Sequence, residues 1–312
     1  MFMPIKSSPR HNSGHNSKGH YRGFTLVETI IAIAILGVVA VISSTFIAGA
    51  FNSYFSSVRR AEMVTTADVA VQRLAREVKL AVPNSLRMQD SAGNIPCSTG
   101  TCYIEFVPTK SGGTYRNNGD GSTAGNFLCN AMTGTINTTF DVLGPGLATT
   151  PAIAANDFIV IDNDANLPSG TDVYGAVGSG SRTLILTASL ASPNSMTISS
   201  AFTTNSTIIC NYQNNRYQVI DQNIQAVTYS CPMTTPGAIT RYAAYGFNSS
   251  QITSGLTGGV TVAGNTTYPA TCTATYNANA QERNGILSFA ITITSGGETI
   301  TVFRQIHVDN SP

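Results

Sequence analysis

Glu28 is the only ionisable side chain in the longest apolar stretch of the chain. That stretch runs from Phe24 to Phe51, and Gly23 directly precedes it. A carboxylate at the centre of a membrane helix costs about 2.5–3.5 kcal/mol on insertion scales. We therefore expect Glu28 to be retained only where it meets a partner that offsets this cost.

The apolar stretch is long enough to form a membrane-spanning helix, which needs about 20 apolar residues. An ordinary signal anchor or a secretory signal peptide is the competing interpretation. A signal peptide carries an apolar core of about 7–15 residues, and a small-residue cleavage site follows that core. Here the well-placed small residue, Gly23, precedes the core, so the pattern disfavours a conventional signal.

Residues 1–23 form a basic flank that contains no Asp or Glu. Short basic flanks of membrane helices stay in the cytoplasm, so the rest of the chain is predicted to face the periplasm or the exterior. Outside this flank acidic residues slightly outnumber basic ones, which argues against a nucleic-acid-binding surface. The charged and titratable residues of the flank are Lys6, Arg10, His11, His15, Lys18, His20 and Arg22.

The segment Gly23-Phe24-Thr25-Leu26-Val27-Glu28 closely resembles the processing site of type IV prepilins and of type II secretion pseudopilins. The resemblance implies that a prepilin peptidase/N-methyltransferase cuts after Gly23 and methylates the new N-terminus at Phe24. It further implies that Glu28 neutralises the N-terminal amine of a neighbouring subunit. The implied partners are that enzyme, other major and minor pilins, and an assembly platform in the inner membrane.

Four segments are expected along the chain: a cleaved leader (1–23), a membrane or filament-core helix (24–51), an amphipathic continuation (52–82) and a periplasmic β-rich domain (83–312). The continuation is predicted from apolar residues at three- and four-residue steps. Pro83 should end it, because proline lacks a donor and disfavours helix in the preceding residue. The apolar positions are Val64, Ala67, Val71, Leu74, Ala75, Val78 and Val82.

Beyond Pro83 the apolar pattern changes to the period of two that is typical of strands. The clearest prediction is a C-terminal hairpin, in which 287–293 and 300–308 alternate around a turn at 295–298. Segments 109–126 and 247–268 are rich in small and polar residues and are interpreted as surface loops. The other predicted strands are 103–107, 158–161, 183–187, 217–220, 226–229, 241–245 and 273–276.

All six cysteines follow the predicted membrane helix, which places them in an oxidising compartment. Six cysteines allow many pairings. Two are close in sequence, two flank predicted strands, and the last pair follows only by elimination. Zinc is disfavoured, because no CxxC pair exists and no histidine lies near a cysteine. The tentative pairs are Cys97–Cys102, Cys231–Cys272 and Cys129–Cys210.

Asp162, Asp164 and Asn166 have the spacing that opens a calcium-binding loop. However, Leu167 stands where such a loop needs glycine, and Val173 stands where it needs glutamate. A plain turn rich in Asp and Asn is the favoured interpretation.

An enzymatic constellation is absent from the sequence. The three leader histidines would be removed, which leaves His307 on a predicted strand, and the chain has no GxSxG, P-loop or HExxH motif. We therefore expect neither catalysis nor a cofactor.

Landmarks spread over the mature chain resemble the MshO-type minor pilins of the MSHA (mannose-sensitive haemagglutinin) pilus system. They are the segments 71–79, 81–87, 140–145, 216–221, 227–231 and 305–312. The resemblance implies an α+β, type IV pilin-like fold, with the long N-terminal helix packed on an antiparallel β-sheet that carries disulfide-bonded loops. It also implies a subunit that primes or caps a pilus. A J-type minor pseudopilin of a type II secretion system and a tip adhesin remain alternatives.

Overall fold

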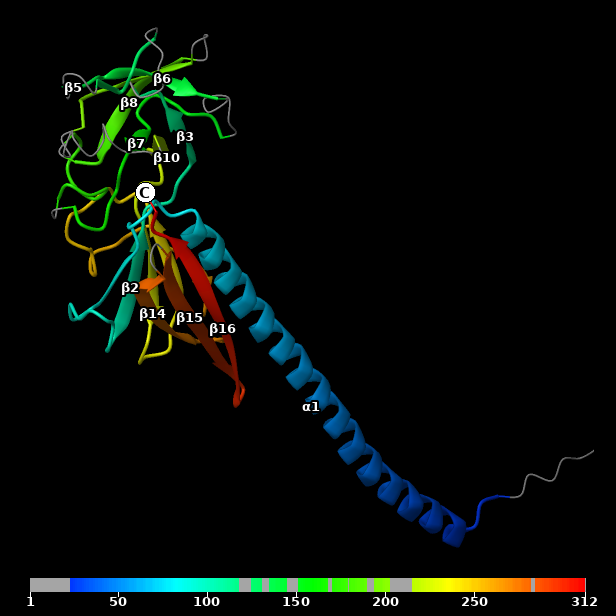
Figure 1. Cartoon of the computed structure of the whole chain (residues 1–312). Coiled ribbons are helices and arrows are strands. Elements are labelled where there is room, and N and C mark those ends of the chain that lie inside the picture. The colour runs from blue at the N-terminus through cyan, green and yellow to red at the C-terminus, as the bar shows by residue number, and fades with distance from the viewer. Residues whose placement is uncertain are drawn as a thin grey trace, which may run out of the picture. The chain divides into compact units, whose positions relative to one another are not determined.

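The computed structural model describes residues 23–117, 125–130, 135–144, 151–167, 170–178, 180–189, 194–202, 215–281 and 284–311. The chain divides into two units, Met1–Ser57 and Val58–Pro312. Of the predicted leader, only Gly23 belongs to the described residues, and so the leader's other residues lie outside them. Figure 1 shows the elements with their labels.

Helix α1 (Leu26–Lys79) begins in the first unit and ends in the second. The predicted helix began two residues too early, at Phe24, and ended three residues too late, at Val82. At its C-terminal end, the amides of Leu80 and Ala81 bond to carbonyls three residues back, which tightens the last turn. Ala81 then forms an isolated bridge with Pro108, so the chain leaves the helix before Pro83 is reached.

The part of α1 in the second unit buries one face against the β-rich domain. Val64 was predicted on this face but is 44% exposed, whereas Met63 is buried. Steps of four, three and four residues from Met63 reach Ala67, Ala70 and Leu74 and define a single face, from which Val64 is one position away. The buried residues of the helix are Met63, Ala67, Ala70, Val71, Leu74, Ala75 and Val78.

Two antiparallel sheets share the hydrophobic core of this helix face. The first contains, in spatial order, β1 (Arg87–Asp90), β2 (Thr101–Phe106), β11 (Val227–Pro232), β12 (Ile239–Ala243) and β13 (Val260–Ala263). The second contains β14 (Ala270–Gln281), β15 (Asn284–Ser295) and β16 (Glu298–Asp309). A helix therefore packs on antiparallel sheets, as the sequence predicted.

The predicted C-terminal hairpin is confirmed as β15 and β16, which pair from Ser295↔Glu298 to Asn284↔Asp309. Gly296 and Gly297 form the two-residue turn with φ of 56° and 79°. Positive φ at both turn residues matches the right-handed twist of the strands, and glycine adopts it without steric cost.

A closed six-stranded barrel forms the other part of the second unit. Its order is β10 (Arg216–Ile220), β3 (Ser111–Tyr115), β6 (Thr139–Leu143), β9 (Ser195–Ile198), β8 (Arg182–Ser189) and β7 (Phe158–Val160). A short ribbon pairs β4 (Cys129–Asn130) with β5 (Thr135–Ile136). The domain is therefore mostly β, and the expectation of a simple α+β pilin fold with one sheet is corrected.

Two predicted loops contain strands. Segment 109–126 contains β3, and segment 247–268 contains β13. In β3 a Cβ on Gly112 would lie 2.9 Å from the carbonyl oxygen of Tyr217, and one on Gly113 would lie 2.7 Å from the Tyr217 hydroxyl. The glycines that suggested a loop instead permit β10 to approach β3 closely.

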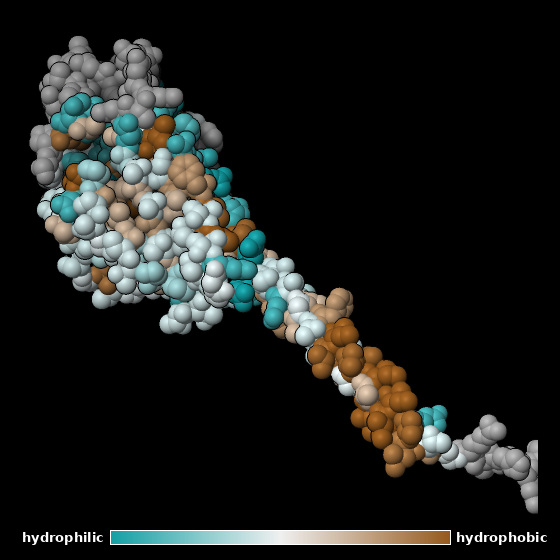
Figure 2. All heavy atoms as spheres, turned by 90° about the horizontal axis from the view of Figure 1, so that it is seen from below, coloured by the Kyte–Doolittle hydropathy of each residue, from teal (hydrophilic) through white to brown (hydrophobic). Residues whose placement is uncertain are grey.

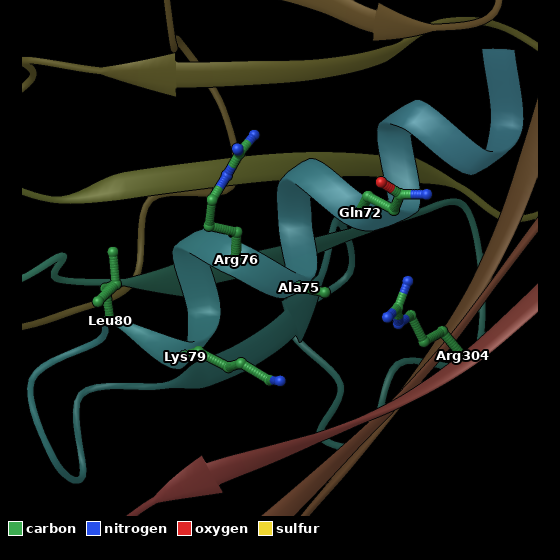
Figure 3. Close-up of a pocket in the computed structure, with 6 residues that line it drawn as sticks. All are labelled: Gln72, Ala75, Arg76, Lys79, Leu80 and Arg304. Atoms are coloured by element: carbon green, nitrogen blue, oxygen red, sulfur yellow. The ribbon is translucent and has the colours of Figure 1, made fainter. Parts of the chain in front are cut away.

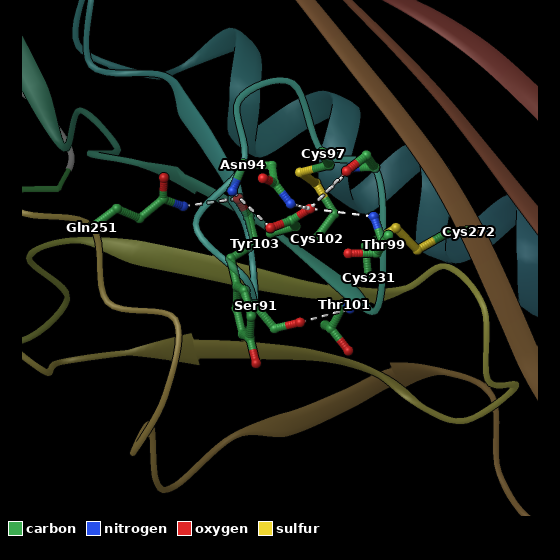
Figure 4. The surroundings of a disulfide bond; sticks show 12 residues. Ser91, Asn94, Cys97, Thr99, Thr101, Cys102, Tyr103, Cys231, Gln251 and Cys272 are labelled. Atoms are coloured by element: carbon green, nitrogen blue, oxygen red, sulfur yellow. Dashed lines mark hydrogen bonds between the residues drawn. A yellow bond between two sulfur atoms is a disulfide. The ribbon is translucent and has the colours of Figure 1, made fainter.

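Disulfides join Cys97 to Cys102 and Cys231 to Cys272, the two pairs that the sequence favoured. Figure 4 shows both bridges beside the 91–101 loop. The second bridge links β11 to β14 and so connects the two sheets. Cys129 is also disulfide-bonded, while Cys210 lies outside the described residues.

Candidate functional site

The first turn of α1 contains a helix cap that the apolar pattern alone did not reveal. Thr25 precedes the helix, and its Oγ1 accepts a hydrogen bond of 3.2 Å from the amide of Glu28. The carbonyl of Thr25 accepts the first helical bond, from the amide of Thr29. Thr25-Leu26-Val27-Glu28 has the T-x-x-E sequence pattern of a capping box, and the structure shows the threonine bond of that pattern.

The Glu28 carboxylate is exposed and contacts no charged or hydrogen-bonding group among the described residues. It lies in the first helical turn, where the positive end of the helix dipole favours a negative charge. The cap thus fixes the backbone of Glu28 in the first turn of the helix, and the carboxylate oxygens are available to another molecule.

The Gly23–Phe24 peptide bond lies just before this cap, outside the helix. Phe24 is 82% exposed, and no atom comes within 4 Å of the position where a Cβ of Gly23 would stand. Peptidases act most readily on exposed chain that lies outside regular secondary structure. The structure therefore leaves the predicted cleavage position sterically open.

The helix beyond Glu28 presents apolar side chains on all sides. Figure 2 shows the brown apolar residues along this part of α1. By length and composition α1 includes a candidate membrane span, no residue of which is buried against the described chain. The large apolar residues that are exposed from Leu26 to Phe51 are Leu26, Val27, Ile30, Ile31, Ile33, Ile35, Leu36, Val38, Val39, Val41, Ile42, Phe46, Ile47 and Phe51.

This arrangement combines an apolar surface that needs lipid or protein cover with one unpartnered carboxylate. Leaving so much apolar surface in water is unfavourable, at about 25 cal/mol for each Å². A cation placed next to Glu28 in an apolar environment would be strongly attracted, because the low dielectric weakens screening. The site therefore favours a positively charged group next to Glu28.

The structure places the weak calcium candidates in one turn. Asp164 accepts hydrogen bonds from the amide and the side chain of Asn166, as in an Asx turn. Asp162 is buried, and burial, with the nearby Asp164 charge, raises the pKa of its carboxyl. Asn163 between them accepts from the Val173 amide, a structural bond.

Among the described residues, no group of three or more His, Cys, Asp and Glu side chains has an arrangement that could hold a metal ion. His307 lies exposed on β16.

Residues 18–44 match a protein family described as the Prokaryotic N-terminal methylation motif. No curated protein and no solved structure matches the chain. The match supports a type IV pilin or pseudopilin-like protein that prepilin peptidase processes and that assembles with other pilins. It points to a structural subunit rather than to an enzyme, and with α1 it suits a single-pass inner-membrane protein.

Proposed function

We propose that this chain is a minor pilin that takes part in the biogenesis of an MSHA-type type IV pilus. In this proposal the peptidase cuts after Gly23, Phe24 is methylated, and the processed subunit enters or primes the filament through α1. The observation that carries the proposal is the unpartnered Glu28 carboxylate, held by the Thr25 cap at the start of an uncovered apolar helix.

Glu28 acts in this proposal by pairing with the positive N-terminal amine at Phe24 of a neighbouring subunit. An unpaired carboxylate in an apolar environment is costly, and the gain from pairing grows as the dielectric falls. A subunit in the membrane therefore gains most when it docks in the register that brings these two groups together. The capped first turn holds Glu28 ready for this contact.

The apolar part of α1 has two environments in the proposed cycle. It lies in the inner membrane before assembly, and afterwards it packs against the corresponding helices of other subunits. Both environments cover the side chains that the rest of the described chain leaves exposed. The globular domain stands in the periplasm, and in the assembled pilus it lies at or near the tip.

The finer assignment to the MSHA system is supported by the resemblance of segments spread over the mature chain. In the structure, 71–79 is the end of α1, 227–231 lies in β11, and 305–309 is the end of β16. Residues of all three segments, Val308 among them, belong to the hydrophobic core between the helix and the sheets. The resemblance thus includes elements that pack together.

The test compares Glu28→Gln with the wild type in cells that produce the pilus. We expect Glu28→Gln to be cut and methylated normally but to be depleted from sheared pili at least tenfold. Intact mass and N-terminal sequence report processing, and immunoblots of sheared pili report incorporation. Asp68→Asn is the matched control, because Asp68 lies on the same helix beyond the apolar stretch.

Each other outcome has a definite meaning. Equal incorporation of Glu28→Gln would contradict the role of the carboxylate, and an uncut chain would contradict the pilin pathway itself. Normal pili in a deletion strain that fails to secrete a periplasmic enzyme would identify the chain as a J-type pseudopilin. Binding of the purified protein to glycans, with assembly unaffected by its deletion, would favour an adhesin.

A further inference from the structure

Three cationic residues are among those that line a groove between the end of α1 and strand β16. Arg76 and Lys79 come from the helix, and Arg304 comes from the strand. In Figure 3 Arg304 extends from β16 toward the helix, and Gln72 and Lys79 lie across the groove from it. The groove has a volume of about 670 Å³.

Arg304 occupies this groove because of its register in the hairpin. It pairs with the buried Phe289, and it stands between Val302 and Ile306 on the face of β16 that packs toward α1. Along that face it is the only position that is fully exposed. A long cationic side chain therefore takes a place where the strand's alternation calls for an apolar one.

No described residue neutralises these three charges. Arg76, Lys79 and Arg304 form no ion pair or hydrogen bond with any residue that the structure describes. On the same helix, by contrast, Glu77 pairs with Arg73 at 3.2 Å and with Arg241 at 2.8 Å. A groove lined by three cations that no described residue neutralises favours an anionic occupant.

The edge of β16 beside the groove is also unpaired. β16 is the last strand of its sheet and pairs only with β15 among the described strands. In a hairpin with a two-residue turn, residues 299, 301, 303, 305, 307 and 309 direct their backbone groups away from β15. The contacts of Thr299 with Thr294 and of Thr301 with Thr292 fit this register.

An open strand edge is a template for another strand, and proteins that keep one free commonly protect it. β16 has twelve residues, and Phe303 on its outer face is 61% exposed. Backbone donors and acceptors at this edge can pair with a polypeptide, whereas a lipid headgroup offers no matching row. The edge therefore favours a polypeptide as the anionic occupant.

We infer that β16 and the groove beside it form a docking site for an extended acidic segment of another polypeptide. The segment adds a strand to the free edge of β16, and its carboxylates bind Arg76, Lys79 and Arg304. This inference goes beyond the proposed function and does not depend on cleavage at Gly23 or on Glu28.

The test uses the purified full chain in zwitterionic detergent micelles and a synthetic peptide of alternating Thr and Glu. The same peptide with Lys in place of Glu tests charge, and an acidic peptide with alternate backbone N-methyl groups tests strand pairing. The charge-reversed variant Arg76→Glu/Lys79→Glu/Arg304→Glu tests the groove. Arg216→Glu is the control variant, because Arg216 is an exposed cation on β10, a strand of the barrel, and does not line the groove. Fluorescence anisotropy measures each affinity.

We expect the acidic peptide to bind the wild type and the control variant, and to bind the charge-reversed variant at least tenfold more weakly. The Lys peptide and the N-methylated peptide should each bind the wild type at least tenfold more weakly. Absence of binding by the acidic peptide, or equal binding to the charge-reversed variant, overturns the inference.

Phosphatidylglycerol vesicles separate a polypeptide from a lipid occupant. If vesicles bind through the three cations while the acidic peptide does not, the groove is a lipid site and the inference is wrong. Processing at Gly23 is measured on the same preparations by intact mass. A chain that is not cut at Gly23 can therefore be distinguished from a chain that does not bind the acidic peptide.

Discussion

The Nε of Arg87 donates a hydrogen bond of 2.7 Å to a carboxylate oxygen of Glu105, whose side chain is fully buried in the first sheet. The same guanidinium donates to the carbonyls of Asn248 and Ser249 and lies 3.6 Å from the centre of the Tyr174 ring. Arg87 therefore connects β1 and β2 with a loop and with the segment that precedes β8.

Removing this cation should destabilise the domain strongly. Burial raises the pKa of Glu105, and the hydrogen bond and charge of Arg87 counteract part of that effect. Arg87→Met leaves a buried carboxylate with only the Tyr245 hydroxyl as a donor, at a cost of about 3 kcal/mol. Urea unfolding of the full chain in detergent measures the loss.

The double variant Arg87→Met/Glu105→Leu provides the control. It removes the buried charge together with its partner, so it should be more stable than Arg87→Met alone. If the two variants have the same free energy of unfolding, Glu105 is not the source of the loss. A double-mutant cycle then assigns the effect to the other contacts of Arg87.

Asp90 should make the stability of the 91–101 loop depend on pH. Burial raises the pKa of this carboxyl, but hydrogen bonds from Asn94, Ser98 and Thr99 outweigh it and hold the pKa well below its ordinary value of 3.8. A depressed pKa in the folded state stabilises the protein above that ordinary value and loses its effect as the pH falls further.

We expect the melting temperature of the wild type to fall between about pH 4 and pH 2, by more than that of Asp90→Asn, because carboxylates lose their charge in this range. Asp90→Asn should already be less stable at pH 7, since the amide cannot accept all the bonds of the carboxylate. Parallel pH profiles of the two proteins would contradict this role of Asp90.

Thr25→Ala should loosen the first turn of α1. The substitution removes the hydroxyl that accepts the Glu28 amide, and loss of such a cap costs about 1 kcal/mol. Hydrogen exchange of the amides of Glu28 and Thr29, which donate to Thr25, should quicken about fivefold in lipid nanodiscs, as expected for that energy. Thr25→Ser keeps an acceptor at the cap, so its amides should exchange at the wild-type rate. If the amides of Thr25→Ala also exchanged at the wild-type rate, the cap would have no stabilising role.

The two disulfides should contribute unequally to stability. The Cys231–Cys272 bridge has a sequence separation of 41, and the Cys97–Cys102 bridge a separation of 5. Because the larger loop restricts the unfolded chain more, Cys231→Ala/Cys272→Ala should lower the free energy of unfolding by about 3 kcal/mol, and Cys97→Ala/Cys102→Ala by less. Denaturant unfolding under non-reducing conditions compares them, and the opposite order would contradict this entropic argument.

Local patterns in the sequence were sufficient for the elements that depend on neighbouring residues. The hairpin of β15 and β16 follows from strict alternation around Gly296-Gly297, two residues that adopt positive φ freely. The apolar helix around Glu28 follows equally from composition and length. The fine position of the buried helix face did not follow, because Met63 and Val64 are both apolar and only packing distinguishes them.

The barrel could not be predicted from the sequence, because its strands are short and strands that pair with each other lie far apart in the chain. β6 pairs with β9 across more than 50 residues, and β3 contains two glycines that suggest a loop. Strand pairing depends on side-chain packing between partners more than on the propensity of each strand.

The sequence by itself determined the apolar N-terminal part of α1 and the place of Glu28 as the one ionisable residue of the stretch 24–51, because both depend on residues that are adjacent in the chain. Only the tertiary structure decided which charges are neutralised. Arg87, Arg241 and Arg304 look alike in the sequence. The first two pair with Glu105 and Glu77, whereas the third lines a groove and has no ion pair with any residue that the structure describes. The difference arises because strand register and helix packing, rather than local composition, bring distant charges together or keep them apart.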